Sequence, residues 1–323
     1  MPKILHTARY TDKPWDILKS VVPEGFTIET LEEPTYGCLL HQCVDTDYLL
    51  VSGRLPIDEG VLSAAKHLKM IQRTGVGTEM LDFDAIARHG IPAFVNRGVN
   101  ARSVAEHTMT LILASLKRLP QVNKQTHGGV WEKQQTGMTT HELKAKTVAL
   151  VGMGNIGCLV AHMLQAFGAN IIYTDEVRQP TEVEQRLGLS YYDSFEAMLP
   201  ETDILSFHCP LTPDNMEILN SRTIAMMKHG VIIVNTARGK LINADDLYEA
   251  LKSEHFSAAA LDTHYEEPLK EGYKLAELDN VILTPHIAGL SYEAFHDMMK
   301  GAIDNIVAFE EGRIAEIGSK RVL

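Results

Sequence analysis

The chain has 323 residues and a formal net charge of −12, with 45% hydrophobic and 22% charged residues. This length suits about two domains of roughly 150 residues each, and the composition is typical of a globular protein with a sizeable core. The acidic balance argues against a binder of the nucleic-acid backbone, because such a protein needs a basic face.

Short apolar runs alternate with helix-like stretches through the first hundred residues. Such alternation predicts βαβ units and therefore a parallel sheet. The predicted strands are residues 3–6, 26–31, 48–51, 70–72 and 93–96, and the predicted helices are residues 15–21, 57–67 and 83–88.

Residues 101–118 form a long helical pattern, and Pro120 follows its end. Residues 121–141 are polar and contain glycine, which indicates a connection between two domains. The alternation then resumes, with a predicted helix at residues 156–167 and predicted strands at residues 147–151, 170–174, 204–208, 231–235, 257–261 and 281–284. We therefore predict an α/β fold with two doubly wound, Rossmann-like parallel-sheet domains.

A glycine-rich turn, Gly-x-Gly-x-x-Gly, lies between the strand at residues 147–151 and the helix that follows it. Gly152 permits a tight turn, and Gly154 lets the backbone approach a pyrophosphate. Gly157 lets the helix pack close to the strand. The first free N–H groups of the helix, around Asn155 and Ile156, would meet the phosphates.

Asp175 closes the next strand, 18 residues after Gly157, close to the roughly 20 expected for an acid that binds the ribose hydroxyls. The glycines alone could be a turn before a helix, but strand, turn, helix and acid together favour a dinucleotide site. Asp175 and Glu176 would repel the 2′-phosphate of NADP, whereas the arginine at Arg178 could hold it. We predict NAD as the cofactor, with NADP as the less favoured alternative.

Three later segments each place a chargeable residue just past a predicted strand, at the edge where ligands bind in open α/β sheets. Arg238 lies in Asn-Thr-Ala-Arg-Gly, Glu267 directly precedes a proline, and His286 lies in Thr-Pro-His-Ile-Ala-Gly. Taken singly, each has an ordinary structural explanation, such as a salt bridge or a solvated side chain. In this order after the glycine turn, they resemble the D-isomer-specific 2-hydroxyacid dehydrogenase family.

The resemblance covers nearly the whole chain and implies NAD-dependent interconversion of a 2-keto acid and a D-2-hydroxy acid. His286 resembles the family's acid/base residue, since an imidazole exchanges a proton near neutral pH. Glu267 resembles its partner, because a nearby carboxylate favours the imidazolium. Arg238 resembles the substrate anchor, because a guanidinium can hold a carboxylate.

Further residues follow from the glycine spacing and the resemblance together. The cofactor residues are predicted to be Val104, Gly152, Gly154, Asn155, Ile156, Gly157, Asp175, His208, Cys209, Pro210, Thr236, Ala237, Asp262, Ala288 and Gly289. The substrate residues are predicted to be Ser52, Gly53, Arg54, Val76 and Gly77. By the same resemblance, Asp262 would orient the nicotinamide, and the N–H groups of Val76 and Gly77 would bind the substrate carboxylate.

Arg54 could meet a distal anion on a larger substrate, or it could simply face solvent. Whether Arg54 or Arg97 touches substrate stays open at this point. We expect a discontinuous substrate (catalytic) domain of residues 1–98 and 291–323, with an NAD-binding Rossmann domain of residues 99–290 inserted into it and a cleft between the two. The resemblance implies a homodimer formed through residues 101–118 and their neighbours.

The four cysteines show neither C-x-x-C spacing nor a dense framework, which favours a reducing compartment. No signal peptide and no run of about 18 apolar residues is visible, so we expect a cytoplasmic protein with no membrane partner and no nucleic-acid partner. No metal site is predicted. Two alternatives remain: a phosphite dehydrogenase-like enzyme and an NAD-sensing, corepressor-like binding protein, since both can retain the Arg, Glu and His. A formate enzyme is disfavoured, because glutamine would be expected in place of Glu267.

Overall fold

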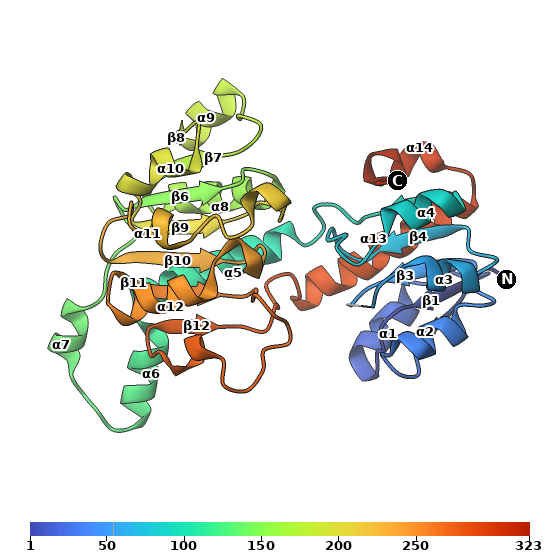
Figure 1. The fold of residues 1–323 in the computed structure, drawn as a ribbon, viewed down its shortest axis with the longest axis horizontal. Coiled ribbons are helices and arrows are strands. Elements are labelled where there is room, and N and C mark those ends of the chain that lie inside the picture. Colours follow the sequence, from blue (N-terminus) through green and yellow to red (C-terminus); the bar gives the residue numbers. More distant parts are fainter. Residues whose placement is uncertain (54) are drawn as a thin grey trace. The chain divides into compact units, whose positions relative to one another are not determined.

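Two parallel sheets organise the chain in the computed structural model, which describes residues 1–53 and 55–323. The chain divides into a discontinuous unit, Met1–Asn100 with Leu290–Leu323, and an inserted unit, Ala101–Gly289. In Figure 1 the discontinuous unit carries the blue and red ends of the chain, and the inserted unit runs from teal to orange. The prediction of an α/β fold with two doubly wound, Rossmann-like parallel-sheet domains is confirmed.

The discontinuous unit contains a five-stranded parallel sheet in the order β2-β1-β3-β4-β5. Its strands are β1 (Lys3–His6), β2 (Thr27–Thr30), β3 (Tyr48–Val51), β4 (Met70–Arg73) and β5 (Ala93–Phe94). Its helices are α1 (Asp12–Ser20), α2 (Tyr36–Gln42), α3 (Glu59–Ala64), α4 (Phe83–His89), α13 (Tyr292–Glu310), α14 (Ile314–Ile317) and η5 (Gly318–Lys320).

The central strand β3 supplies both faces of this unit's core, because successive side chains of a strand point to opposite faces of the sheet. Leu49 and Val51 belong to one apolar cluster, while Tyr48 and Leu50 belong to the other. Helix α13 packs into the second cluster, although β3 ends at Val51 and α13 begins only at Tyr292. The C-terminal tail therefore completes the core of the unit in which the chain begins.

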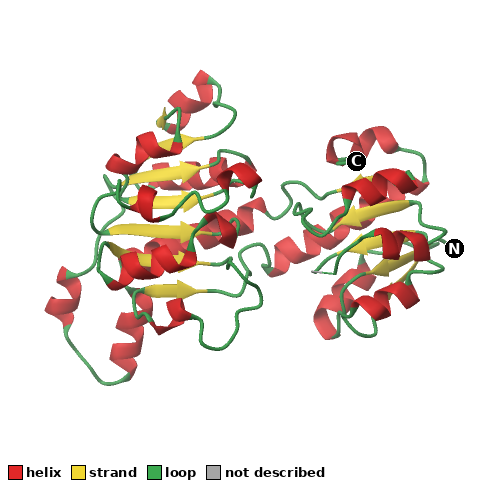
Figure 2. Ribbon diagram, in the orientation of Figure 1, coloured by secondary structure: helices red, strands yellow, loops and turns green. Residues whose placement is uncertain are grey.

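The inserted unit contains a seven-stranded parallel sheet in the order β12-β11-β10-β9-β6-β7-β8 (Figure 2). Its strands are β6 (Thr147–Val151), β7 (Asn170–Thr174), β8 (Leu189–Tyr191), β9 (Ile204–Phe207), β10 (Val231–Asn235), β11 (Phe256–Leu261) and β12 (Val281–Leu283). The chain leaves β6 toward β7 and β8, then returns to form β9 on the other side of β6. This reversal creates a switch point at the carboxyl edge, where nucleotides bind in doubly wound folds.

Helices cover both faces of this sheet. They are α5 (Ala101–Leu116), α6 (Leu119–His127), α7 (Lys133–Met138), α8 (Asn155–Ala166), α9 (Thr181–Leu187), α10 (Phe195–Met198), η1 (Leu199–Glu201), η2 (Pro213–Asn215), α11 (Ser221–Ile224), η3 (Gly239–Leu241), α12 (Ala244–Lys252) and η4 (Lys274–Glu277). All five residues of β10 are buried, as expected for a parallel strand covered on both sides.

Five predicted strands agree with the structure residue for residue, namely residues 3–6, 48–51, 147–151, 170–174 and 231–235. The prediction that residues 121–141 connect two domains is wrong, because they lie inside the inserted unit, where α6 and α7 occupy most of them. Neither helix contains a buried residue, so neither has the apolar periodicity that reveals a helix in a sequence. Within the two described ranges, no helix combines the length and apolarity needed to cross a membrane.

Candidate active site

The glycine turn joins β6 to α8. At two of its positions, Gly152 and Gly157, the neighbouring backbone leaves no room for a side chain. A Cβ on Gly152 would lie 2.7 Å from the carbonyl carbon of His208, and one on Gly157 would lie 2.2 Å from the Gly152 oxygen. Gly152 also has a φ of 100°, which an L side chain rarely adopts. At Gly154 a Cβ would meet nothing within 4 Å, so this position is open to a ligand.

Gly154 is the N-cap of α8, a helix of 12 residues, and it brings no side chain to cap the first N–H groups. Such uncapped N–H groups, aligned with the helix dipole, favour an anion such as a pyrophosphate. Asp175 lies beside the turn, because its Oδ2 accepts a 2.5 Å hydrogen bond from the Met153 N–H. The tight glycine turn and the uncapped helix N-terminus suit a pyrophosphate, and the neighbouring Asp175 suits a ribose. Together they fit a dinucleotide.

His208 leaves β9 next to the turn and donates its backbone N–H to the Val151 oxygen at 2.7 Å. Its Nε2 lies 2.9 Å from Ser206 Oγ, and burial lowers the pKa of the ring to about 3. Burial also raises the pKa of the Cys209 thiol to about 11. The His208 ring and the Cys209 thiol are therefore both neutral near neutral pH, and neither adds a charge beside the glycine turn.

The carbonyl of Pro210 accepts a 2.8 Å hydrogen bond from Asn215 Nδ2. Asn215 Oδ1 in turn accepts from the Thr212 N–H at 2.8 Å, which closes a capping box at η2. The structure gives Asn215 the task of holding the segment that follows His208.

Arg238 follows β10 on a turn organised by the buried side chain of Asn235. Asn235 Nδ2 donates to the Arg238 oxygen at 2.8 Å, and its Oδ1 accepts from the Ala237 N–H at 2.9 Å. A Cβ on Gly239 would lie 2.0 Å from the carbonyl carbon of His264, so the Arg238 turn packs directly on the loop after β11. Sequence reasoning assigned no role to Asn235 or Gly239, although both lie in the same short motif as Arg238.

Glu267 and His286 form a hydrogen-bonded pair between the loops that follow β11 and β12. Glu267 Oε2 lies 2.8 Å from His286 Nδ1, and Glu267 Oε1 accepts the His264 N–H at 2.8 Å. The Glu267 side chain is 16% exposed and the His286 side chain 47%. The carboxylate is thus fixed inside while the imidazole reaches solvent. With Nδ1 engaged, Nε2 is the ring nitrogen left to exchange a proton.

Asp262 is fully buried and holds the loop that carries His286. Its Oδ1 accepts from Thr284 Oγ1 at 2.6 Å and from the Ile287 N–H at 2.9 Å, and its Oδ2 accepts from the Ala288 N–H at 2.9 Å. His107 Nε2, on α5, lies 3.6 Å from Asp262 Oδ1. The role of Asp262 at the nicotinamide stays a prediction. The hydrogen bonds give Asp262 a second, structural role, which is to hold the segment on either side of His286.

The backbone of His286 has a φ of 59°, in the left-handed region. This conformation costs about 1–2 kcal/mol for a residue with a side chain, so the surrounding structure must impose it. The hydrogen bonds of Asp262 on one side, and that of His264 Nε2 to the Thr284 oxygen at 2.9 Å on the other, fasten both ends of the segment. His286 is therefore aimed by its neighbours.

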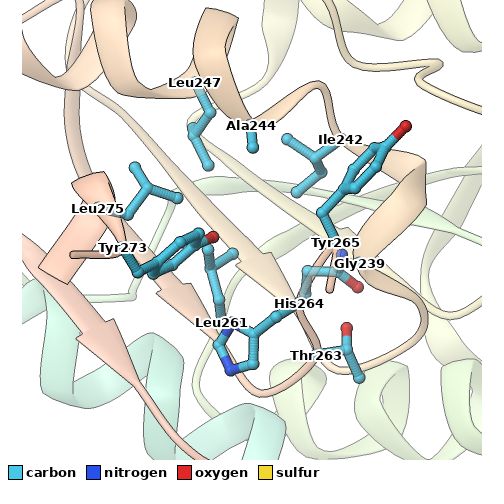
Figure 3. A pocket seen from close by; sticks show the side chains of 11 residues that line it. Gly239, Ile242, Ala244, Leu247, Leu261, Thr263, His264, Tyr265, Tyr273 and Leu275 are labelled. Atoms are coloured by element: carbon cyan, nitrogen blue, oxygen red, sulfur yellow. The ribbon is translucent and has the colours of Figure 1, made fainter. Parts of the chain in front are cut away.

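A small cavity lies behind this loop, with His264, Thr263 and Gly239 among its lining residues (Figure 3). Its volume is about 10 Å³, room for about one water molecule and not for a cofactor or a keto acid. Within the described part of the chain, Thr263 Oγ1 and His264 Nδ1 are buried without a hydrogen-bond partner. The cavity is therefore too small to be a substrate site.

Four further predicted cofactor residues are almost wholly buried: Val104, Thr236, Ala237 and Ala288. Thr236 Oγ1 lies 2.9 Å from Thr108 Oγ1, and the Ala288 oxygen accepts from Ser103 Oγ at 2.7 Å. These contacts tie α5 to the ends of the strands. Cofactor contacts for the four residues, and for Gly289, stay predictions.

The predicted substrate residues Ser52, Gly53, Val76 and Gly77 belong to the discontinuous unit, and Arg54 lies outside the described residues. Ser52 is held on three sides. Its Oγ contacts His6 Nε2 at 2.5 Å, its N–H donates to Thr7 Oγ1 at 3.1 Å, and its oxygen accepts from Thr7 Oγ1 at 3.0 Å. Gly53 has a φ of 75°, and Val76 is 46% exposed.

The fold and the glycine turn define a Rossmann-type dinucleotide-binding protein, and comparison with known proteins narrows the class. Residues 109–288 match the profile of the "D-isomer specific 2-hydroxyacid dehydrogenase, NAD binding domain". A glyoxylate reductase of Aeropyrum pernix is 36% identical over 290 residues, which cover 88% of this chain and 85% of that one. A hydroxypyruvate reductase of Thermotoga maritima is 38% identical over 252 residues, covering 77% and 80%.

The crystal structure of the TT0316 protein from Thermus thermophilus superposes with a TM-score of 0.85 at 31% identity, covering 96% of this chain and 97% of that one. The chain belongs to the D-isomer-specific 2-hydroxyacid dehydrogenase family. It is an NAD-dependent oxidoreductase, so the predicted family, enzyme class and cofactor are confirmed.

Proposed function

We propose that the protein reduces a short 2-keto acid to the D-2-hydroxy acid, and that His286, Glu267 and Arg238 carry the chemistry. The observation that carries this proposal is the 2.8 Å hydrogen bond between His286 Nδ1 and Glu267 Oε2. This pair follows β11 and β12, in the sheet whose β6 and β7 end at the glycine turn and at Asp175.

The reaction adds a hydride to the keto carbon and a proton to the keto oxygen. Bound NADH supplies the hydride. His286 supplies the proton from Nε2, because Nδ1 is engaged by Glu267. The Glu267 carboxylate holds the imidazole ring by Nδ1 and leaves Nε2 for the proton transfer, as a general acid requires. In the reverse direction the neutral imidazole takes the proton back.

Arg238 anchors the substrate carboxylate through its guanidinium, which stays charged throughout the reaction. Two observations support this placement. Arg238 follows β10, which pairs with the strand that leads to Glu267. Gly239 then brings the two loops into backbone contact. The backbone N–H groups of Val76 and Gly77 are proposed to bind the same carboxylate.

Small 2-keto acids are the proposed substrates, because this chain spans 85% of a relative named glyoxylate reductase and 80% of one named hydroxypyruvate reductase. A panel that includes both acids, run with NADH and with NADPH, tests this proposal. We expect NADH oxidation and a D-configured product. Tight NADH binding without turnover of any acid would favour an NAD sensor, and NAD reduction by phosphite would favour the phosphite enzyme.

Arg54 is proposed to select for a second polar or anionic group on the substrate. Arg54→Ala should then lower kcat/KM more for charged 2-keto acids than for uncharged ones. An equal effect on both classes would mean that the side chain only faces solvent.

We also propose that the protein forms a homodimer through α5 and its neighbours α6 and α7, and that it acts in the cytoplasm. Leu119, Trp131 and Met138, on or beside the last two helices, are 56%, 82% and 83% exposed. Large exposed apolar side chains of this kind favour association. Sedimentation of the full chain at several concentrations measures the oligomeric state, and a monomer throughout would contradict the dimer.

His286→Ala tests the catalytic assignment. Loss of a positioned acid should lower kcat by about 100- to 10,000-fold, while the Kd for NADH stays within about twofold. His296→Ala, at a half-buried histidine of α13, is the matched control and should change neither quantity. Loss of NADH binding in the His286 variant would show that this residue serves the cofactor instead.

A further inference from the structure

Arg178 lies on a loop that wraps the glycine turn. On one side of it, Asp175 accepts the Met153 N–H at 2.5 Å and the Val177 N–H at 3.1 Å. On the other side, Gln179 Nε2 donates to the Met153 oxygen at 2.9 Å. The residues flanking Arg178 thus touch the turn that is to hold the pyrophosphate. The guanidinium of Arg178 itself is directed elsewhere.

That side chain is turned onto α9. Arg178 Nε and Nη2 donate to the two carboxylate oxygens of Glu184, both at 2.9 Å. Glu184 also accepts from Tyr173 Oη at 2.7 Å, and the Arg178 guanidinium lies 5.0 Å from the centre of the Tyr191 ring. In Figure 1 the elements that supply these partners, β7, β8 and α9, lie together at one end of the seven-stranded sheet.

The pair is unequal in exposure, because the side chain of Arg178 is 60% exposed and that of Glu184 only 9%. An arginine that left this pair would leave a buried carboxylate without its counter-charge, which is strongly unfavourable. Consistent with the contact, the pKa of the Glu184 carboxyl is lowered by its hydrogen bond to Arg178. The geometry therefore opposes any movement of Arg178 toward a bound nucleotide.

We infer that Glu184 is a cofactor-selectivity residue, which disfavours NADPH by holding Arg178 away from the 2′-phosphate. In other proteins a guanidinium next to the adenosine ribose is a natural partner for that phosphate. Here the loop begins with the acids Asp175 and Glu176, while the guanidinium of Arg178 is engaged on α9. The inference depends on NAD binding by the inserted unit and not on which acid is reduced.

Glu184→Gln tests the inference, because glutamine keeps the shape and can still accept from Tyr173 while losing the charge that holds Arg178. The dissociation constants for NADH and NADPH are measured by nucleotide fluorescence on the full chain. We expect the Kd for NADPH to fall about tenfold and the Kd for NADH to stay within about twofold. Glu184→Met fills a similar volume and also removes both contacts with Arg178, so it replaces the first variant if that variant folds poorly.

Two controls separate a released arginine from a general loss of negative charge. Glu182→Gln removes an exposed acid from the same helix and should leave NADPH binding within about twofold. Arg178→Ala combined with Glu184→Gln should abolish the gain. The inference is overturned if the gain persists in the double variant, if Glu182→Gln reproduces it, or if both nucleotides respond equally. A chain that binds NADH but turns over no acid would contradict the proposed reaction and leave this inference standing.

Discussion

The carboxyl edges of the two sheets differ in how much space they leave around their glycines. In the inserted unit, a Cβ on Gly157 would lie 2.2 Å from a backbone oxygen, and one on Gly239 would lie 2.0 Å from a backbone carbon. In the discontinuous unit, a Cβ on Gly53 would meet Ala8 Cβ at 3.8 Å, and one on Gly75 would meet nothing within 4 Å. At these positions the first edge packs backbone on backbone, with the open Gly154 beside them, whereas the second leaves open space.

The polar groups of the two edges differ as well. The inserted unit buries the ionisable Asp262, with two backbone N–H groups and one hydroxyl donating to it. The discontinuous unit ties Ser52 to the neutral side chains of His6 and Thr7. A charged, fully hydrogen-bonded network fixes one geometry, while neutral contacts beside open space tolerate changes of side chain. This difference agrees with the proposed function, in which the inserted unit carries the proton and hydride transfer and the discontinuous unit selects the substrate.

The largest effect should come from filling the tight edge. Gly239→Ala forces the Arg238 turn away from the loop that carries Glu267, and misplacement of reacting groups by about 1 Å can cost about 100-fold in rate. We therefore expect kcat to fall about 100-fold and the thermal midpoint to drop, measured by steady-state kinetics and calorimetry. Gly75→Ala is the matched change at the open edge, and it should leave the midpoint within about 2 °C. Equal destabilisation by both variants would erase the contrast between the edges.

A smaller effect is expected from removing one hydrogen bond at each edge. Thr284→Val removes the 2.6 Å bond to Asp262, and a bond to a charged group contributes about 2 kcal/mol. Amide exchange at Ile287 and Ala288 should accelerate accordingly, and kcat should fall about tenfold. Ser52→Ala removes a neutral bond and should loosen its own loop by about 1 kcal/mol. A larger loss of protection around Ser52 than around Ile287 would reverse the proposed ranking of the two edges.

Much of the fold was predictable because strands buried on both faces appear in the sequence as continuous apolar runs. Strand β10 is the clearest case, with all five residues buried and its bounds predicted correctly. Helices α6 and α7 were not predicted, since neither buries a residue in the part of the chain that the structure describes. Their large exposed side chains, such as Leu119 and Met138, are the ones that the proposed dimer would cover, and a pattern based on burial does not reveal them.

In the site, motif order predicted Arg238, Glu267 and His286, but the network that aims His286 was not visible in the sequence. Asp262 receives its donors from residues 22 to 26 positions away, and two of them are backbone N–H groups that any residue would provide. In the same way, the contact of Ser52 with His6 spans 46 positions. Such contacts depend on which strands become neighbours, and only the folded sheet supplies that order.

The smallest effect at neutral pH is predicted for a buried histidine, a feature that the two edges share. Each unit keeps a histidine next to a serine, His6 with Ser52 and His208 with Ser206. Burial lowers the pKa of each ring from 6.5 to about 3. The unfolded chain therefore binds these protons first as the pH falls. The stability due to the neutral rings is complete above pH 6.5 and is lost as the pH falls toward 3, by about 1.4 kcal/mol per pH unit for each ring.

His6→Asn should remove this acid sensitivity from the discontinuous unit alone, because asparagine can still contact Ser52 but does not titrate. Hydrogen exchange, corrected for its intrinsic pH dependence and compared at pH about 7 and about 5, resolves the two units separately. We expect the variant to retain protection in β1 and β3 at the lower pH, while β6 and β9 lose protection as they do in the unaltered protein. Unchanged acid sensitivity of β1 and β3 in the variant would mean that another group titrates there, and the parallel between the two buried histidines would then fail.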